Sequence, residues 1–214
     1  MGKNTKFQAA LPPRFPSFSP RYAMHSESHD LPGMLPVAII VDDDTVDASA
    51  LLSSIVQTQR ALGRSVHGLL MTRPNGGSDC SADMVLVDIQ TQDQYLVSQR
   101  LGGESSGCRA DPQGFARASR VLRIAMTQSP DLVISNRFGN LEAEGGGFHA
   151  ELLELMANGI PLLTVVATRH LAAWREFSGG AGMVLPAQEA PILEWIEAIT
   201  AAQGQVGAAR ASHA

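Results

Sequence analysis

From residue 37 onward, and most clearly between residues 131 and 202, short apolar runs alternate with segments whose apolar side chains recur every three or four positions. Strands are predicted at residues 37–41, 65–71, 131–135, 161–166 and 183–185. Helices are predicted at residues 46–62, 112–127, 148–158, 168–177 and 189–202. Because strands joined through helices of this length run parallel, the predicted fold is α/β, with a mainly parallel sheet between two helical layers.

One segment departs from this alternation. Residues 84–98, "MVLVDIQTQDQYLVS", have the pattern of a β-hairpin with its turn near Gln92 and Asp93, and we expect it at an edge of the sheet. In parallel sheets, ligands bind beyond the carboxyl ends of the strands. A ligand site is therefore expected in the loops 42–46, 136–147 and 166–169.

The predicted domain organisation is simple. Residues 1–35 are rich in Pro and Ser without helical or strand periodicity, which predicts a disordered N-terminal arm. Residues 36–202 are predicted to form a single α/β domain, and residues 203–214 a flexible tail. No signal-peptide pattern is present, so a cytoplasmic location is expected; a weak likeness of the basic arm to a transit peptide is the alternative.

Composition and charge exclude some partners. The hydrophobic fraction of 44% and charged fraction of 17% are typical of globular proteins, and no apolar run approaches the roughly 18 residues that cross a bilayer. With a net charge of −5, a broad attraction to nucleic acid or anionic lipid is not expected. The expected partner is a small anionic ligand bound locally. Homodimer formation is also considered. Four apolar side chains lie at helical spacing and are expected to pack either in the core or in a dimer contact: Trp174, Phe177, Trp195 and Ile196.

The loop after the first strand contains Asp42, Asp43, Asp44 and Thr45 but no glycine. A phosphate-binding loop needs glycines to wrap its backbone N–H groups around the phosphates, and a lysine to reach them. The simpler interpretation is that Asp44 or Thr45 caps the following helix. The alternative is that these side chains hold Mg²⁺ or hydrogen-bond to a ligand.

The loop after the strand at 131–135 is richer in groups that bind anions. Asn136 and Arg137 are good donors to an oxyanion, and Arg169, after the next strand, is a candidate to join them. Gly145, Gly146 and Gly147 precede a helix and are expected to present free N–H groups to an anion. Glu142 and Glu144 are candidates to orient Arg137 or bind a cation. The alternative is a flexible turn with solvated side chains.

The same stretch, "DLVISNRFGNLEAEGGGF", resembles the Walker B region of the small thermophilic nucleoside-triphosphatase family, in which an apolar strand leads into an Asp-Glu-Ile-Gly-Lys-Met-Glu pattern. Gly139 and Glu142 match that pattern, whereas Asn136 and Arg137 stand in place of its first two acids. Neither an amide nor a guanidinium can act as a general base, so the catalytic acids of that pattern are absent at these positions.

Residues 37–186 resemble more closely an uncharacterised bacterial domain-of-unknown-function family that is related to those triphosphatases and often labelled as molybdenum-transport ATP-binding proteins. The match is carried by "VDDDTVDASALL", "GGSDCSADMVLVDI", "GCRADP", "NRFGNLEAEGGGF" and "GIPLLTVV". The resemblance implies a P-loop-like fold whose phosphate loop is rewritten, and a link to molybdate.

Cys80 and Cys108 each lie in a Gly/Ser-rich segment with an Asp three residues later. The spacing does not supply the four ligands of a structural zinc site. Two inert thiols are expected, with a reversible disulfide or a soft metal site as alternatives.

These observations predict a binding protein with a degenerate nucleotide-binding fold that holds a nucleotide or an oxyanion such as molybdate, in metal or cofactor handling. A Mg²⁺-dependent nucleoside triphosphatase or phosphoryl-transfer enzyme, with Glu142 positioning water, is the first alternative. A redox or metal-relay protein that uses Cys80 and Cys108 is the second.

Overall fold

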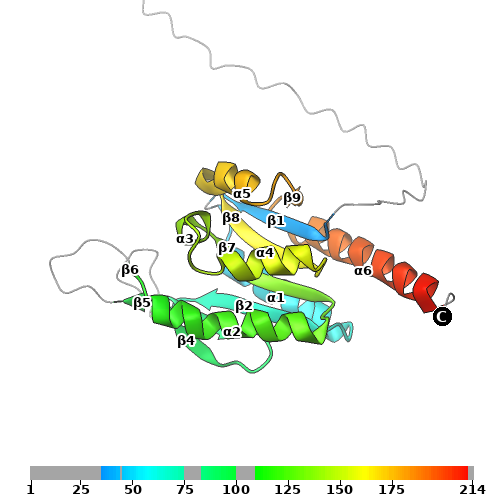
Figure 1. The fold of residues 1–214 in the computed structure, drawn as a ribbon, viewed down its shortest axis with the longest axis horizontal. Coiled ribbons are helices and arrows are strands. Elements are labelled where there is room, and N and C mark those ends of the chain that lie inside the picture. Colours follow the sequence, from blue (N-terminus) through cyan, green and yellow to red (C-terminus); the bar gives the residue numbers. More distant parts are fainter. Residues whose placement is uncertain (1–34, 44, 75–82, 100–108, 212–214) are drawn as a thin grey trace, which may run out of the picture. The chain divides into compact units, whose positions relative to one another are not determined.

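The computed structural model describes residues 35–43, 45–74, 83–99 and 109–211 (Figure 1). Almost all of the predicted N-terminal arm lies outside these ranges, and so do Asp44, Cys80 and Cys108. What the sequence indicates for those residues stays a prediction, as does the division into arm, domain and tail.

Among the described residues, seven strands form one sheet in the order β4-β3-β2-β7-β8-β1-β9. They are β1 (Val37–Asp42), β2 (Val66–Thr72), β3 (Val85–Asp88), β4 (Gln94–Leu96), β7 (Leu132–Phe138), β8 (Leu162–Ala167) and β9 (Met183–Leu185). Strands β2, β7, β8, β1 and β9 pair in parallel, and β3 and β4 pair antiparallel at one edge. The mainly parallel sheet and the edge hairpin are therefore confirmed. A separate short pair joins β5 (Ser98–Gln99) to β6 (Arg109–Ala110).

Helices cover both faces of the sheet (Figure 1). They are α1 (Ala48–Ala61), α2 (Pro112–Gln128), α3 (Asn140–Ala143), α4 (His149–Ala157), the 3-10 turn η1 (Thr168–His170), α5 (Leu171–Phe177) and α6 (Glu189–Ala211). One apolar core contains buried side chains of α2, α4 and α5, and a second contains those of α1 and α6. This arrangement confirms the three layers. Trp174, Trp195 and Ile196 are buried in these cores, so they are not the dimer contact considered above.

The cap of α1 differs from the prediction. Asp47 lies at the N-cap with an extended backbone, and its carboxylate accepts hydrogen bonds from the N–H groups of Ser49 and Ala50 at 2.9 and 3.1 Å. Asp43 instead accepts bonds from the N–H and the hydroxyl of Thr45. The cap predicted at Asp44 or Thr45 is wrong because the helix begins at Ala48, so that only residue 47 can reach its first N–H groups.

Two element ends also differ. Strand β7 continues to Phe138 through an irregularity in its pairing with β8, so Asn136 and Arg137 belong to the strand and not to a loop. Phe138 is fully buried with its ring 5.2 Å from that of Trp174, and this packing extends the strand beyond the polar pair. Helix α6 continues to Ala211, so the helix end predicted at residue 202 is wrong. In the described part of the chain, no helix is both long enough and apolar enough to span a bilayer.

Candidate functional site

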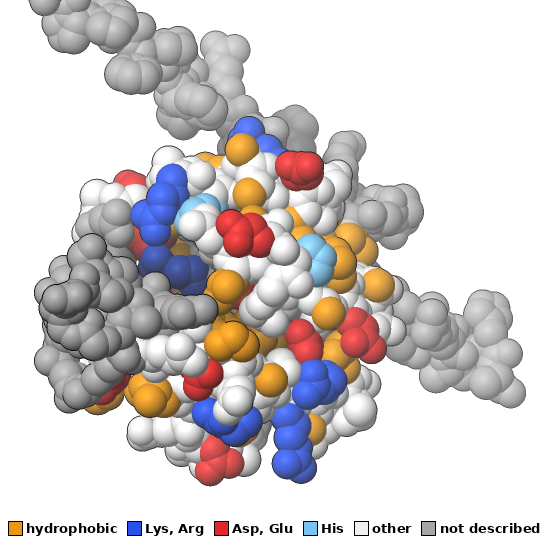
Figure 2. Space-filling model, turned by 60° about the vertical axis from the view of Figure 1, so that its left-hand side comes forward, with side chains coloured by type: hydrophobic (Ala, Val, Ile, Leu, Met, Phe, Trp, Pro, Cys, Tyr) orange, Lys and Arg blue, Asp and Glu red, His pale blue; other side chains and the backbone are white. Residues whose placement is uncertain are grey.

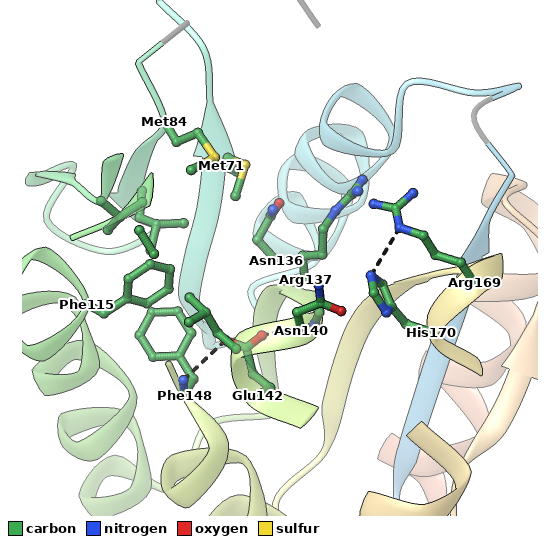
Figure 3. Close-up of a pocket in the computed structure, with 15 residues that line it drawn as sticks. Met71, Met84, Phe115, Asn136, Arg137, Asn140, Glu142, Phe148, Arg169 and His170 are labelled. Carbon is green, nitrogen blue, oxygen red and sulfur yellow. Dashed lines mark hydrogen bonds between the residues drawn. The ribbon is translucent and has the colours of Figure 1, made fainter. Parts of the chain in front are cut away.

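A cavity of about 360 Å³ opens beyond the carboxyl ends of β2 and β7 (Figure 3). This is the edge of the sheet at which a parallel α/β fold places its ligands. Six side chains with polar groups line it: Asn136, Arg137, Asn140, Glu142, Arg169 and His170. Its apolar side, here called the apolar wall, consists of Met71, Met84, Leu86, Val97, Phe115 and Phe148.

Three nitrogen-rich side chains form one side of the opening and are here called the basic mouth: Arg137 from the end of β7, and Arg169 and His170 from η1. The Arg169 Nε–H donates to His170 Nε2 at 3.2 Å. Figure 3 shows both guanidinium groups on the same side of the cavity, and Figure 2 shows basic side chains gathered near a histidine on one face of the molecule. The structure thus brings together Arg137 and Arg169, the two arginines that the sequence singles out.

The basic mouth changes the protonation of its histidine. Partial burial lowers the pKa of His170, and the positive charges of Arg169 and then Arg137 lower it further. All three effects disfavour a third positive charge at this place. An anion placed beside this ring would oppose the effect of the two arginines.

Arg137 is held by an acid from the other predicted loop. Its Nη2 donates to Asp42 Oδ2 at 2.5 Å, although β8 lies between β7 and β1 in the sheet. Asp42 is buried, with 6% of its surface exposed, while the Arg137 side chain is 34% exposed. The guanidinium is therefore fixed on one side and accessible on the other. Asp42 is the acid that orients Arg137, a role the sequence suggested for Glu142 or Glu144.

Asn136 is 6% exposed and lies at the cavity between Met71 and Arg137 (Figure 3). No hydrogen bond joins its side-chain amide to any residue that the structure describes. The amide atoms of Asn136 are not among the fully buried polar atoms that lack a partner, so they are open to the space of the cavity. Asn136 therefore has hydrogen-bonding capacity that a ligand in this cavity can use.

Glu142 has a structural role within α3 and α4. It is 4% exposed, and its carboxylate accepts hydrogen bonds from the N–H groups of Gly139 at 2.9 Å and Phe148 at 3.3 Å. Burial raises the pKa of this carboxyl, and the bonds from the amides oppose that shift. The His149 ring also bonds to the Glu142 carbonyl oxygen at 2.7 Å. Glu142 thus joins the end of β7 to the start of α4.

The three glycines lie outside the cavity, and two of their three amides are used within the turn. The N–H groups of Gly145 and Gly146 donate to the carbonyl oxygens of Glu142 and Leu141, which ends α3, and none of the three glycines lines the cavity. The negative charge near the start of α4 is supplied by the protein's own Glu142 carboxylate. For Gly145 and Gly146 the expectation of free amides is wrong, because the turn uses these two N–H groups to end α3.

Of the described residues 42, 43 and 45, only Asp42, at the end of β1, reaches this region. Asp43 and Thr45 are exposed, bonded to each other, and do not line the cavity. Within residues 35–43, 45–74, 83–99 and 109–211, no three His, Cys, Asp or Glu side chains are grouped as metal ligands would be. A Mg²⁺ site that includes Asp44 stays a prediction.

The apolar wall and His170 are parts of the site that the sequence did not reveal. The wall comes from four separate segments, and nothing in their local patterns marks them as neighbours. Phe115 could have been anticipated, because the first turn of a helix in this fold class lies at the carboxyl edge of the sheet. His170 could have been anticipated as the neighbour of Arg169.

Comparison with known proteins agrees with this architecture. Residues 37–195 match the family described as "Protein of unknown function (DUF2478)". The chain belongs to this family. Over 159 residues it is 33% identical to the Molybdenum import ATP-binding protein ModC 2 of Bradyrhizobium diazoefficiens, and this match covers 74% of the chain but 18% of that relative. The chain therefore spans less than a fifth of the length of this relative.

Two solved structures share the fold. The solution structure of a human cancer-related nucleoside triphosphatase matches with a TM-score of 0.56 and 16% identity, covering 78% of this chain and 97% of that one. THEP1 from the hyperthermophile Aquifex aeolicus matches with a TM-score of 0.55 and 14% identity, covering 76% and 95%. At these identities the matches establish the fold alone. This DUF2478 chain has a P-loop NTPase-like fold with a glycine-free loop after β1, as predicted.

Proposed function

We propose that this DUF2478 protein binds a small anionic ligand, a nucleotide or an oxyanion, in the cavity beyond β2 and β7. The observation that carries the proposal is the convergence of the basic mouth and the Asn136 side-chain amide on a single cavity. The chain as a whole carries a charge of −5, so this local gathering of cations is a specific feature and not part of a general basic surface.

The two arginines suit complementary tasks. Arg137 is fixed by Asp42 and offers a planar group of known direction, which favours recognition of a carboxylate, phosphate or similar oxyanion. Arg169 is exposed and adjusts to the bound group. Together with the neutral form of His170, they supply several N–H donors to one anion.

Relatedness supports the same class of ligand. The fold is shared with nucleoside triphosphatases, and a relative is named for molybdenum import and ATP binding. Binding of a nucleotide or of molybdate in metal or cofactor handling is consistent with both. The first alternative, hydrolysis of nucleoside triphosphates, has less geometric support, because Asp42 bonds to Arg137 and the Glu142 carboxylate bonds to two amides. The redox alternative concerns cysteines outside the described residues.

A thermal-shift panel tests the proposal with phosphate, sulfate, molybdate and ATP. We expect one or more of these anions to raise the unfolding temperature of the wild-type protein, since a ligand that binds the native state stabilises it. The Arg169→Gln variant should need about tenfold more ligand for the same shift, the loss expected for one charge-assisted hydrogen bond.

Arg175→Gln is the matched control, because Arg175 is exposed on α5, carries the same charge and does not line the cavity. Shifts of equal size in both variants would show that any anion binds elsewhere.

A further inference from the structure

The two sides of the cavity differ in chemistry. The basic mouth comes from β7 and η1, whereas the apolar wall comes from β2, from residues 84–97 in and around β3, from α2 and from Phe148 at the N-cap of α4. In Figure 3, Met71, Met84 and Phe115 lie across the cavity from Arg169 and His170. A ligand that fills this space must therefore present an anionic group on one side and an apolar surface on the other.

The apolar wall suits a flat ring. Phe115 and Phe148 are tilted against each other with ring centroids 5.1 Å apart, and Met71 and Met84 add flexible, polarisable thioethers. Aromatic and thioether groups make favourable contacts with ring faces and edges. An inorganic oxyanion would contact the basic mouth but would leave this wall unused.

Asn136 lies between the two sides and specifies a further property of the ligand. Its amide has one acceptor and two donor hydrogens, and none of them is used by a described residue. A ring with nitrogen or oxygen atoms on its edge can bond to this amide, whereas a hydrocarbon ring would leave it without a partner. The preferred ring is therefore heteroaromatic.

We infer that the cavity binds a heteroaromatic phosphate, such as a nucleoside monophosphate, with its ring on the apolar wall, its ring edge at Asn136 and its phosphate at the basic mouth. A cavity of about 360 Å³ falls within the range of roughly 300–1,000 Å³ that is usual for small-molecule sites. The inference rests on the proposed function and adds to it the class of ligand. It also places the ring on the β2 side of the cavity and the phosphate beside Arg137, which bonds to Asp42 at the end of β1.

Isothermal titration calorimetry of the full chain separates the contributions of ring and phosphate. The probes are inorganic phosphate, adenosine, phenyl phosphate, AMP and flavin mononucleotide. We expect AMP or flavin mononucleotide to bind at least about tenfold more tightly than phosphate, phenyl phosphate to fall between them, and adenosine to bind weakly. Which of the two larger probes binds better identifies the source of the ring.

Variants assign each part of the ligand to its side of the cavity. Arg169→Gln should weaken AMP and phosphate by the same factor, since both contact the basic mouth. Met71→Gln keeps the length of the side chain and should weaken AMP while leaving phosphate unchanged. Met183→Gln is its matched control, because Met183 is 40% exposed on β9 and does not line the cavity. Asn136→Ala should weaken AMP about tenfold without affecting phenyl phosphate, whose ring edge has no polar atom.

The outcomes distinguish this inference from the proposed function. If AMP and phosphate bind equally well and both depend on Arg169, the ring has no site; the inference is then overturned while anion binding stands. If no probe depends on Arg169, both are overturned. If Asn136→Ala weakens the binding of AMP and of phenyl phosphate by the same factor, the amide does not recognise the ring edge, and that part of the inference is overturned. Thermal unfolding of each variant shows whether it is folded, and Asn136→Ala tests the ring side independently if Met71→Gln is unstable.

Discussion

Substitution of Gly147 by alanine provides a quantitative test of the interactions around Glu142. Gly147 has a φ of +55°, and a Cβ atom there would lie 2.2 Å from Glu142 Oε1. Gly145 has a φ of +85° in the same turn, but a Cβ atom there would meet nothing within 4 Å. The two variants therefore share the backbone cost and differ in the collision with a buried carboxylate.

The expected magnitudes follow from these contacts. A non-glycine residue in the left-handed region costs about 1–2 kcal/mol, offset by about 0.4–1 kcal/mol because alanine restricts the unfolded chain. Gly145→Ala should thus lower the free energy of unfolding by about 1 kcal/mol. Gly147→Ala must also displace Glu142 from the N–H groups of Gly139 or Phe148, and one charge-assisted hydrogen bond contributes about 1.5–3 kcal/mol. Its total loss should be about 2–4 kcal/mol.

Equilibrium unfolding in urea measures both variants, and an unchanged slope with denaturant would show that only stability has changed. In a Glu142→Ala background, Gly147→Ala should cost no more than Gly145→Ala, because the carboxylate is gone. Equal losses for the two glycine variants in the wild-type background would refute the role assigned to Glu142.

Three further outcomes are expected. Asp42→Asn should lower the free energy of unfolding by about 1–2 kcal/mol, as measured by urea unfolding; the loss is modest because Arg137 is partly exposed. The same variant should bind sulfate more tightly in calorimetry, because it removes a negative charge beside the basic mouth. Sulfate binding should strengthen as pH falls, because the bound anion raises the pKa of His170 from its lowered value in the free protein. The added affinity is complete below the pKa of His170 in the free protein and is lost as pH rises through its pKa in the sulfate complex. His170→Gln should abolish this pH dependence. Gly114→Ala, which usually stabilises a helix, should instead lower the thermal midpoint, because its Cβ would lie 2.1 Å from the Leu96 carbonyl oxygen.

The fold could be predicted because its signal is periodic and local. Each buried strand is an apolar run, and each helix repeats its apolar positions against a sheet face. The end of β7 could not be read in this way, because Asn136 and Arg137 interrupt the apolar run while the sheet pairing continues to Phe138. Side-chain polarity marked the end of the strand too early.

Several polar residues of the candidate site could be predicted one by one, but the contacts between them could not. Asp42 and Arg137 were both singled out, but their ion pair depends on strand order, which places β1 and β7 on either side of β8. The role of Glu142 was missed, although it stands three residues after Gly139, the spacing at which a carboxylate reaches back to the N–H at the start of a helix. The apolar wall depends on contacts between distant segments, and single-sequence patterns do not contain that information.

The central claim is that the basic mouth binds the anionic group of a ligand in this cavity. Calorimetric titration of the wild-type, Arg169→Gln and Arg175→Gln proteins with AMP tests it most directly. The affinity should fall about tenfold in Arg169→Gln and stay at the wild-type value in Arg175→Gln. An affinity that is the same in all three proteins, or that falls equally in the two variants, would contradict the claim.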